Sequence, residues 1–293
     1  MVLKILLSDP ECKMNLLFTG SKGFISQELI NYFSEKKHQL LTTDRTTLDP
    51  RSMQDVENFF KNNKIDVVIH TAIKGGKRNQ PENVNDLFDN LAMFNNLSKF
   101  ADEYNLMINF GSGAAFDREC NIHNAVEKEI FNCLPADYYG LSKNLIARKI
   151  ALLDSNIYNL RLFGCFGIQE EPQRLCRASF NNLMKGEGAI IHQDKYMDYF
   201  YAQDVGKVVE FLIENVEVSV PKDINLCYTQ KTQLSDLAKK IKYLTMAKSN
   251  VIIENETMAN SYTGCSKALD SLNIQLYGLE KGIRECIVNW TKF

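Results

Sequence analysis

The chain has 293 residues, of which 45% are hydrophobic and 24% are charged. Its 34 Lys and Arg residues nearly balance 36 Asp and Glu residues, and the formal net charge of −2 excludes a strong overall attraction to nucleic acid or to an anionic membrane. No apolar run approaches the roughly 18 residues of a membrane helix, and the run from Val2 to Leu7 is interrupted too soon for a signal peptide. We therefore expect a globular, cytoplasmic protein without nucleic-acid or membrane partners.

Strands and helices alternate through the first half of the chain. Apolar, β-branched runs predict strands at 15–19, 39–43, 65–70, 106–110 and 158–162. Helical periodicity predicts helices at 23–35, 52–61, 85–104 and 138–153. The alternation predicts an α/β fold, a Rossmann-type doubly wound parallel sheet with helices on both faces.

The alternation of strands and helices becomes less regular after about Gly167, and further helices are predicted at 204–215, 233–244 and 279–290. We predict a dinucleotide-binding domain over 14–167 and, over 168–293, a smaller C-terminal α/β lobe that binds substrate at the sheet's carboxyl edge. Some segments of the lobe are expected to return to the first domain. Residues 1–13 precede the first strand and form an N-terminal extension to which the sequence assigns no role.

A glycine turn joins the first strand to the first helix. Its sequence is Thr19-Gly20-Ser21-Lys22-Gly23-Phe24-Ile25-Ser26. Glycines at such a turn let the backbone approach a pyrophosphate, which the free N–H groups of the helix N-terminus then bind. Residues Gly20 to Ile25 are therefore candidate cofactor ligands, with Ser26 in place of the usual third glycine.

Two cues for the choice of cofactor compete at the end of the second strand. Asp44 would accept from a ribose 2′-hydroxyl and indicates NAD, whereas Arg45 would accommodate a 2′-phosphate and indicates NADP. Lys22 adds a second cation, so the sequence favours NADP, with NAD possible. Asp49 either accepts from the adenine amino group or caps the helix that follows Pro50.

The most informative stretch is Tyr139-Gly140-Leu141-Ser142-Lys143. A Tyr and a Lys four residues apart share one helix face, and an ammonium favours the phenolate of a group whose ordinary pKa is near 10. Ser112 follows the strand predicted at 106–110 and precedes Tyr139 by 27 residues. Glycine loop, strand-end serine and helical YxxxK follow one another in an order that chance seldom produces.

This order resembles the short-chain dehydrogenase/reductase superfamily, in the extended branch that modifies nucleotide sugars. The resemblance covers the chain from Met14 to Trp290. Further motifs of that branch are matched by Val68 to Ala72, Asn90-Leu91, Ser112 to Phe116, Asp198 to Val205 and Leu279 to Ile283. Within the branch, SGAAFD, DYYGLSK, LRLFGCFG and DYFYAQDV are similar to 4-ketoreductases near CDP-abequose synthase, and Gly75-Gly76 with the GSKG loop is similar to GDP-fucose synthase.

The resemblance implies a hydride transfer from NADPH to the C4 ketone of a nucleotide-linked 4-keto-deoxyhexose. Tyr139 would donate the proton, Ser112 would hydrogen-bond the same oxygen, and Lys143 would hold the nicotinamide ribose and lower the pKa of Tyr139. Further cofactor contacts are implied for Thr71, Ala72, Ile73, Asn90 and Phe163. Substrate contacts are implied for Gly75, Gly76, Gly113, Ala114, Arg174 and Arg177.

Two departures leave the substrate open. Met197 stands where the branch often has an Arg that meets the substrate's phosphates, and Gly164 stands where many epimerases have Asn. Arg174 and Arg177 would supply the missing cation, or they are solvated helix charges. A homodimer through the helices near 85–104 and 138–153 is implied by the family.

Two other functions remain open. An epimerase, or an epimerase and reductase like GDP-fucose synthase, needs a base beside the ketone. Ala114 occupies the position of that base, which leaves Cys176, His123 and His192 as candidates. Dehydratases carry Asp-Glu where this chain has Gly113-Ala114. A non-catalytic dinucleotide-binding regulator usually lacks the Tyr or the Lys, and this chain keeps both. No cysteine or histidine spacing matches a metal site, so none is predicted.

Overall fold

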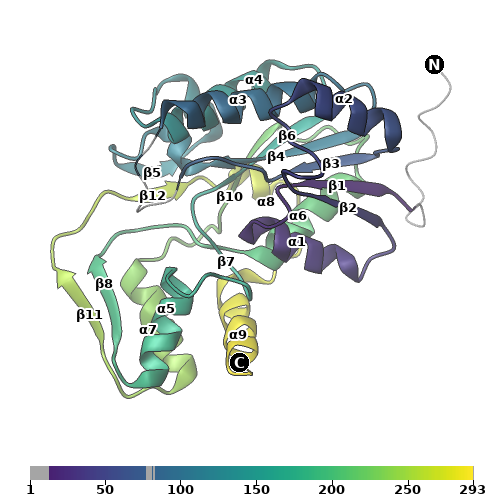
Figure 1. Ribbon diagram of the computed structural model, residues 1–293. Coiled ribbons are helices and arrows are strands. Elements are labelled where there is room, and N and C mark those ends of the chain that lie inside the picture. The colour runs from purple at the N-terminus through teal and green to yellow at the C-terminus, as the bar shows by residue number, and fades with distance from the viewer. Residues whose placement is uncertain (1–12, 77–80, 82, 293) are drawn as a thin grey trace.

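The computed structural model describes residues 13–76, 81 and 83–292. Its centre is a six-stranded, all-parallel sheet with the order β10-β6-β4-β3-β1-β2 (Figure 1). The strands are β1 (Asn15–Thr19), β2 (Gln39–Thr43), β3 (Val67–His70), β4 (Leu106–Ser112), β6 (Ile157–Leu162) and β10 (Asp223–Leu226). The predicted α/β fold with a parallel sheet is confirmed.

Helices cover both faces of this sheet (Figure 1). One face carries α2 (Met53–Asn62), α3 (Val84–Ser98) and α4 (Tyr138–Leu152); the other carries α1 (Phe24–Ser34), α6 (Ala202–Glu214) and the short α8 (Lys267–Asp270). Apolar side chains of the strands fill a core on each side, with Phe18, Ile69 and Ile108 on one and Leu17, Val68 and Met107 on the other. Both faces are buried because strands β1, β3 and β4 place successive apolar side chains in the two core layers.

A smaller lobe lies below the sheet in the view of Figure 1. It contains α5 (Leu175–Lys185), α7 (Leu234–Thr245) and α9 (Gly278–Trp290), with the parallel pair β8 (Ala189–Gln193) and β11 (Val251–Asn255). Its separate core includes Phe180, Leu237, Ile283 and Trp290. The chain returns from this region to the main domain through α6 and β10, which pack on and extend the six-stranded sheet.

Short elements close the carboxyl edge of the sheet. They are the 3-10 helices η1 (Gly113–Phe116) and η2 (Glu127–Phe131), and the parallel pairs β5 (Ile122–Ala125) with β12 (Tyr262–Gly264) and β7 (Cys165–Phe166) with β9 (Phe200–Tyr201). These pairs join segments far apart in sequence and place C-terminal residues beside the end of β4. In the part of the chain that the structure describes, no helix is long and apolar enough to cross a membrane.

Candidate active site

The glycine loop leaves β1 at the point where the strand order reverses, beside the end of β3. Gly20 has φ +70°, and a Cβ placed on it would lie 2.6 Å from the Cα of Ala72. Gly23 N–H donates to Gly20 O and Gly23 caps α1, whose first residues are Phe24 and Ile25. Ser21 N–H is tied to Thr43 O at the end of β2. The loop thus fits the backbone cradle that a dinucleotide pyrophosphate needs.

The segment after β3 is fixed against the glycine loop. Thr71 donates its hydroxyl to Thr19 O at 2.7 Å, and buried His70 shares a 2.8 Å hydrogen bond with Thr19 Oγ1. Asn90 of α3 accepts from Lys74 N–H and donates to Lys74 O, which clamps the chain beyond exposed Ile73. Asn90 therefore fixes the backbone at Lys74, while its remaining amide hydrogen reaches Ser142. Its contact with the cofactor stays a prediction.

The two cofactor cues meet in one ion pair. Lys22 Nζ lies 2.5 Å from Asp44 Oδ2, and the Lys22 side chain is 81% exposed. Hydrogen bonds from Lys22 and Thr46 hold the pKa of Asp44 well below its ordinary range. Arg45 is exposed next to this pair. The Asp44 carboxylate is thus neutralised by a cation at the place where a ribose 2′ group is expected.

Asp49 is engaged by Arg51 rather than by the following helix. Arg51 donates to Asp49 at 2.6 Å and to Asp89 at 3.1 Å, and this ion pair lowers the pKa of Asp49. The helix cap that we considered for Asp49 is wrong, because Ser52 accepts from Asp55 N–H and caps α2. Asp49 as an adenine contact stays a prediction.

Ser112, Tyr139 and Lys143 converge at the carboxyl end of β4. Ser112 is the last residue of that strand, and both Tyr139 and Lys143 come from the first turns of α4. Lys143 Nζ lies 6.0 Å from the Tyr139 ring centroid and donates to Phe110 O at 2.6 Å. The structure therefore brings together the three residues that the sequence singled out.

The electrostatics of the trio differ from our expectation in one respect. We expected Lys143 to lower the pKa of Tyr139, but burial raises that pKa, and the opposing influences are a hydrogen bond from Ser112 and the charge of Arg118. Lys143 is held toward Phe110 O, and burial lowers its own pKa to about 8. Arg118 lies 5.6 Å from the Tyr139 ring centroid and forms an ion pair with Asp137 at 2.6 Å. Sequence reasoning missed this second cation.

One of the predicted glycines, Gly76, lies against the tyrosine. Gly75 and Gly76 both have positive φ, and a Cβ on Gly76 would lie 2.8 Å from the Tyr139 ring. Gly113 is packed beneath Phe163, and Ala114 is buried with its N–H donating to Ser112 Oγ at 3.2 Å. Their contacts with substrate, and that of Phe163 with the cofactor, stay predictions.

Arg174 and Arg177, which the sequence predicted as substrate contacts, pack against different parts of the structure. Arg174 lies 4.9 Å from the Phe24 ring centroid, at the start of α1, and donates to Cys165 O at 2.9 Å. Arg177 lies over Phe180 and Trp290 in the lobe. Only Arg174 of the two therefore stands against the glycine-loop helix.

The candidate bases for epimerisation do not gather at Tyr139. His192 is exposed and bonded to Glu254 at 2.9 Å, and His123 is exposed on β5. Cys176 is 1% exposed in the core of the lobe, and burial raises its pKa. In residues 13–76, 81 and 83–292, no cluster of His, Cys, Asp or Glu could hold a metal ion.

Two features escaped the sequence analysis. Tyr262 of β12 places its hydroxyl 3.5 Å from Ser112 Oγ. A buried polar ladder crosses β4, β6 and β10, and no motif marked it beforehand. Its members, joined by hydrogen bonds of 2.5 to 2.8 Å, are Asn109, Asn159, Arg161, Asp223 and Asn225.

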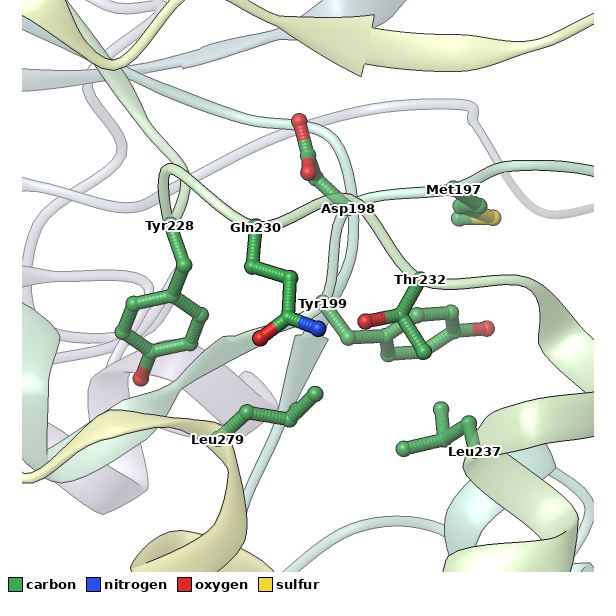
Figure 2. Close-up of a pocket in the computed structure, with 8 residues that line it drawn as sticks. All are labelled: Met197, Asp198, Tyr199, Tyr228, Gln230, Thr232, Leu237 and Leu279. Atoms are coloured by element: carbon green, nitrogen blue, oxygen red, sulfur yellow. The ribbon is translucent and has the colours of Figure 1, made fainter.

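A small pocket lies beside the segment that carries Met197 and Asp198 (Figure 2). Figure 2 shows the Gln230 amide and the Thr232 hydroxyl near Tyr199, with Leu237 and Leu279 on the opposite side. The Asp198 carboxylate is bound by Lys231 at 2.9 Å and by Gly264 N–H at 2.8 Å. Met197 pairs with Tyr262 in a β-bridge, so the pocket adjoins the catalytic region from the side of the lobe.

A parallel doubly wound sheet with a glycine loop and a Ser-Tyr-Lys trio defines a dinucleotide-dependent enzyme of the oxidoreductase type. The chain belongs to the NAD dependent epimerase/dehydratase family, whose model matches residues 16–227. The family resemblance noted in the sequence is thereby confirmed.

Individual relatives are more distant. A GDP-L-fucose synthase of Azorhizobium caulinodans is 25% identical over 244 residues, 72% of this chain and 77% of the relative. The structure of a GDP-mannoheptose C4 reductase from Campylobacter jejuni with NADP bound is 19% identical, with a TM-score of 0.79 over 96% of this chain and 99% of that one. A GDP-L-fucose synthetase from Naegleria fowleri is 15% identical, with a TM-score of 0.78 over 96% and 93%.

Proposed function

We propose that this protein is an NADPH-dependent reductase of the C4 ketone of a nucleotide-linked 4-keto-deoxyhexose. The observation that carries the proposal is the joint placement of Ser112, Tyr139 and Lys143 at the same edge of the sheet as the Gly20 loop. Support for the substrate class comes from the relatives, which include GDP-fucose synthases and a GDP-mannoheptose C4 reductase.

The chain's own residues would divide the reaction as follows. NADPH supplies the hydride when bound against the glycine loop. Tyr139 gives the proton to the oxygen of the former ketone, and the Ser112 hydroxyl donates a hydrogen bond to that oxygen as negative charge develops. Lys143 holds the nicotinamide ribose, and Arg118 favours the tyrosinate that remains after proton transfer.

An epimerase is the alternative. It would need a side chain able to remove a proton beside the ketone, within hydrogen-bond reach of the substrate. Ala114 offers no ionisable group there, Cys176 is buried in the lobe, and His192 lies with Glu254 on the surface. These placements favour reduction without inversion at C3 or C5.

The test combines binding with exchange. Thermal shifts with CDP, dTDP, GDP and UDP, with and without NADPH, identify the nucleotide, because a ligand of the folded state raises the unfolding temperature. The matching 4-keto sugar is then incubated with enzyme in D₂O without NADPH. We expect no enzyme-dependent deuterium at C3 or C5 by NMR; uptake at either carbon supports the epimerase instead.

We also propose that the protein is a homodimer through α3 and α4. Support comes from apolar side chains left exposed on these two neighbouring helices, among them Phe88 at 59% and Leu152 at 78%. Large exposed apolar groups commonly mark contact surfaces. Sedimentation of the wild type against a Phe88→Glu variant tests this, and an unchanged monomer in both would contradict it.

A further inference from the structure

Tyr262 reaches the catalytic serine from a distant part of the chain. Its side chain is 9% exposed, and its hydroxyl lies 3.5 Å from Ser112 Oγ. Two backbone hydrogen bonds hold it in place: its N–H donates to Tyr196 O at 2.8 Å, and its carbonyl accepts from Asp198 N–H at 3.2 Å. The ring also packs edge-on against Phe163, with centroids 5.3 Å apart. The phenol is therefore held near the serine by the bridge to the 196–198 segment and by ring packing.

Hydrogen-bond accounting at Ser112 decides the direction of this contact. A serine hydroxyl has one hydrogen to donate and two lone pairs to accept with. Ala114 N–H already donates to Ser112 Oγ. Among the described residues, Ser112 is the one polar partner of the Tyr262 hydroxyl, and a buried phenol needs an acceptor for its hydrogen.

We propose that Tyr262 is a positioning residue: its hydroxyl donates to Ser112 and thereby orients the single Ser112 hydrogen, which Tyr139 accepts in the free protein and the reacting oxygen accepts once substrate is bound. Ala114 and Tyr262 then donate to both lone pairs of the Ser112 oxygen. The Ser112 hydrogen is therefore directed away from these two groups. A chain Tyr262 to Ser112 to Tyr139 results, and each bond in such a chain polarises the next.

The surroundings keep Tyr262 a donor. Burial raises its pKa above the ordinary value for tyrosine, so it retains its proton near neutral pH. The Lys195 ammonium lies 5.4 Å from its ring centroid. The charged groups that face Tyr139 are Arg118, Asp137 and Lys143, and Arg118 and Asp137 also act on Tyr262.

The test measures the Tyr139 hydroxyl directly. Tyrosine labelled with ¹³C at Cζ reports phenol ionisation by NMR, and a Tyr139→Phe variant assigns the signal. We expect Tyr262→Phe to raise the pKa of Tyr139 by about half a unit or more, because Ser112 loses the hydrogen bond that orients and polarises its hydroxyl group. Tyr196→Phe, which removes an exposed hydroxyl from the same strand environment, should leave that pKa unchanged.

Two further variants sharpen the result. Ser112→Ala should raise the pKa of Tyr139 at least as much, and adding Tyr262→Phe to it should change nothing more, since Tyr262 acts through Ser112. Tyr262→3-fluorotyrosine keeps the fold and strengthens the donor, so it should lower the pKa of Tyr139. An unchanged or lowered pKa in Tyr262→Phe, or an additive double variant, overturns the proposal.

The inference rests on the proposed function only in making Tyr139 the proton donor. The NMR titration needs no substrate, so its failure is distinct from a failure to find a reducible sugar. Once a substrate is in hand, the limb of the pH–kcat profile set by Tyr139 should move with Tyr262→Phe while KM stays within about twofold. A change in KM alone would mean that Tyr262 only lines the substrate site.

Discussion

We expect cofactor choice to depend on two cations, Lys22 and Arg45, beside the Asp44 carboxylate. In the wild type, Lys22 neutralises Asp44 at 2.5 Å, and Arg45 is exposed beside the pair. A 2′-phosphate would draw on both cations. The double variant Lys22→Ala with Arg45→Ala removes them and leaves the Asp44 carboxylate without Lys22, where it repels a 2′-phosphate and accepts from a 2′-hydroxyl.

The expected size follows from the exposure of these groups. Charge-assisted hydrogen bonds contribute about 1.5–3 kcal/mol, and solvent screening at a Lys side chain that is 81% exposed favours the lower end. Each cation is then worth roughly tenfold in affinity, and the two together roughly a hundredfold. NADPH should lose about that factor, while NADH should bind as before or better.

The assay is a fluorescence titration with NADPH and NADH at fixed ionic strength. Lys61→Ala serves as control, because Lys61 is an exposed lysine of α2 paired with Glu57. Adding Asp44→Asn to the double variant should weaken NADH. Tighter binding of NADH than of NADPH by the wild type would refute the reasoning and make Asp44 the deciding residue.

Three further changes have definite expected outcomes. Tyr139→Phe should lower kcat by about 10²–10⁴-fold with little change in the unfolding temperature; turnover within a few-fold of wild type would exclude Tyr139 as the acid. Arg161→Met should destabilise the fold by about 3–5 kcal/mol in urea unfolding, since Arg161 is fully buried and paired with Asp223 at 2.5 Å; a loss under 1 kcal/mol would contradict this. Burial lowers the pKa of Lys143 to about 8, below the ordinary value of about 10.4 in an unfolded chain. Between these two pH values the unfolded chain binds more protons than the folded one, so the free energy of unfolding rises with pH. Lys143→Met should lack that rise, and identical pH profiles of the two proteins would speak against it.

Local patterns predicted most of the main domain. Apolar runs mark strands such as β1 and β3. Each candidate catalytic residue ends or follows a strand or opens a helix, so sequence order already placed them at one edge. The predicted helix at 85–104 ends earlier, at Ser98. There the Tyr104 hydroxyl donates to Leu97 O, and Phe100 stacks on Phe60, so tertiary packing ends a helix that the composition would have continued.

Contacts between distant segments were beyond the sequence. Tyr262 meets Ser112 across 150 residues because β12 pairs with β5, and strands of three or four residues carry no periodicity to detect. Arg161 was noted only as part of a motif; its burial depends on Asp223 and Asn225 arriving on the neighbouring strand. Polar residues in an apparent core strand could have flagged such a ladder, because buried charge requires partners.

The central claim is hydride transfer from NADPH to C4, and isotope transfer tests it most directly. The enzyme is incubated with NADPH whose transferred hydride is replaced by deuteride. The second substrate is the 4-keto-deoxyhexose linked to the nucleotide that raises the enzyme's unfolding temperature. Hydride transfer to C4 predicts one deuterium at C4 of the product sugar by NMR and mass spectrometry, with Tyr139→Phe slowing its appearance. If no deuterium from NADPH appears at C4 of any of the CDP, dTDP, GDP and UDP sugars, hydride transfer to C4 is contradicted.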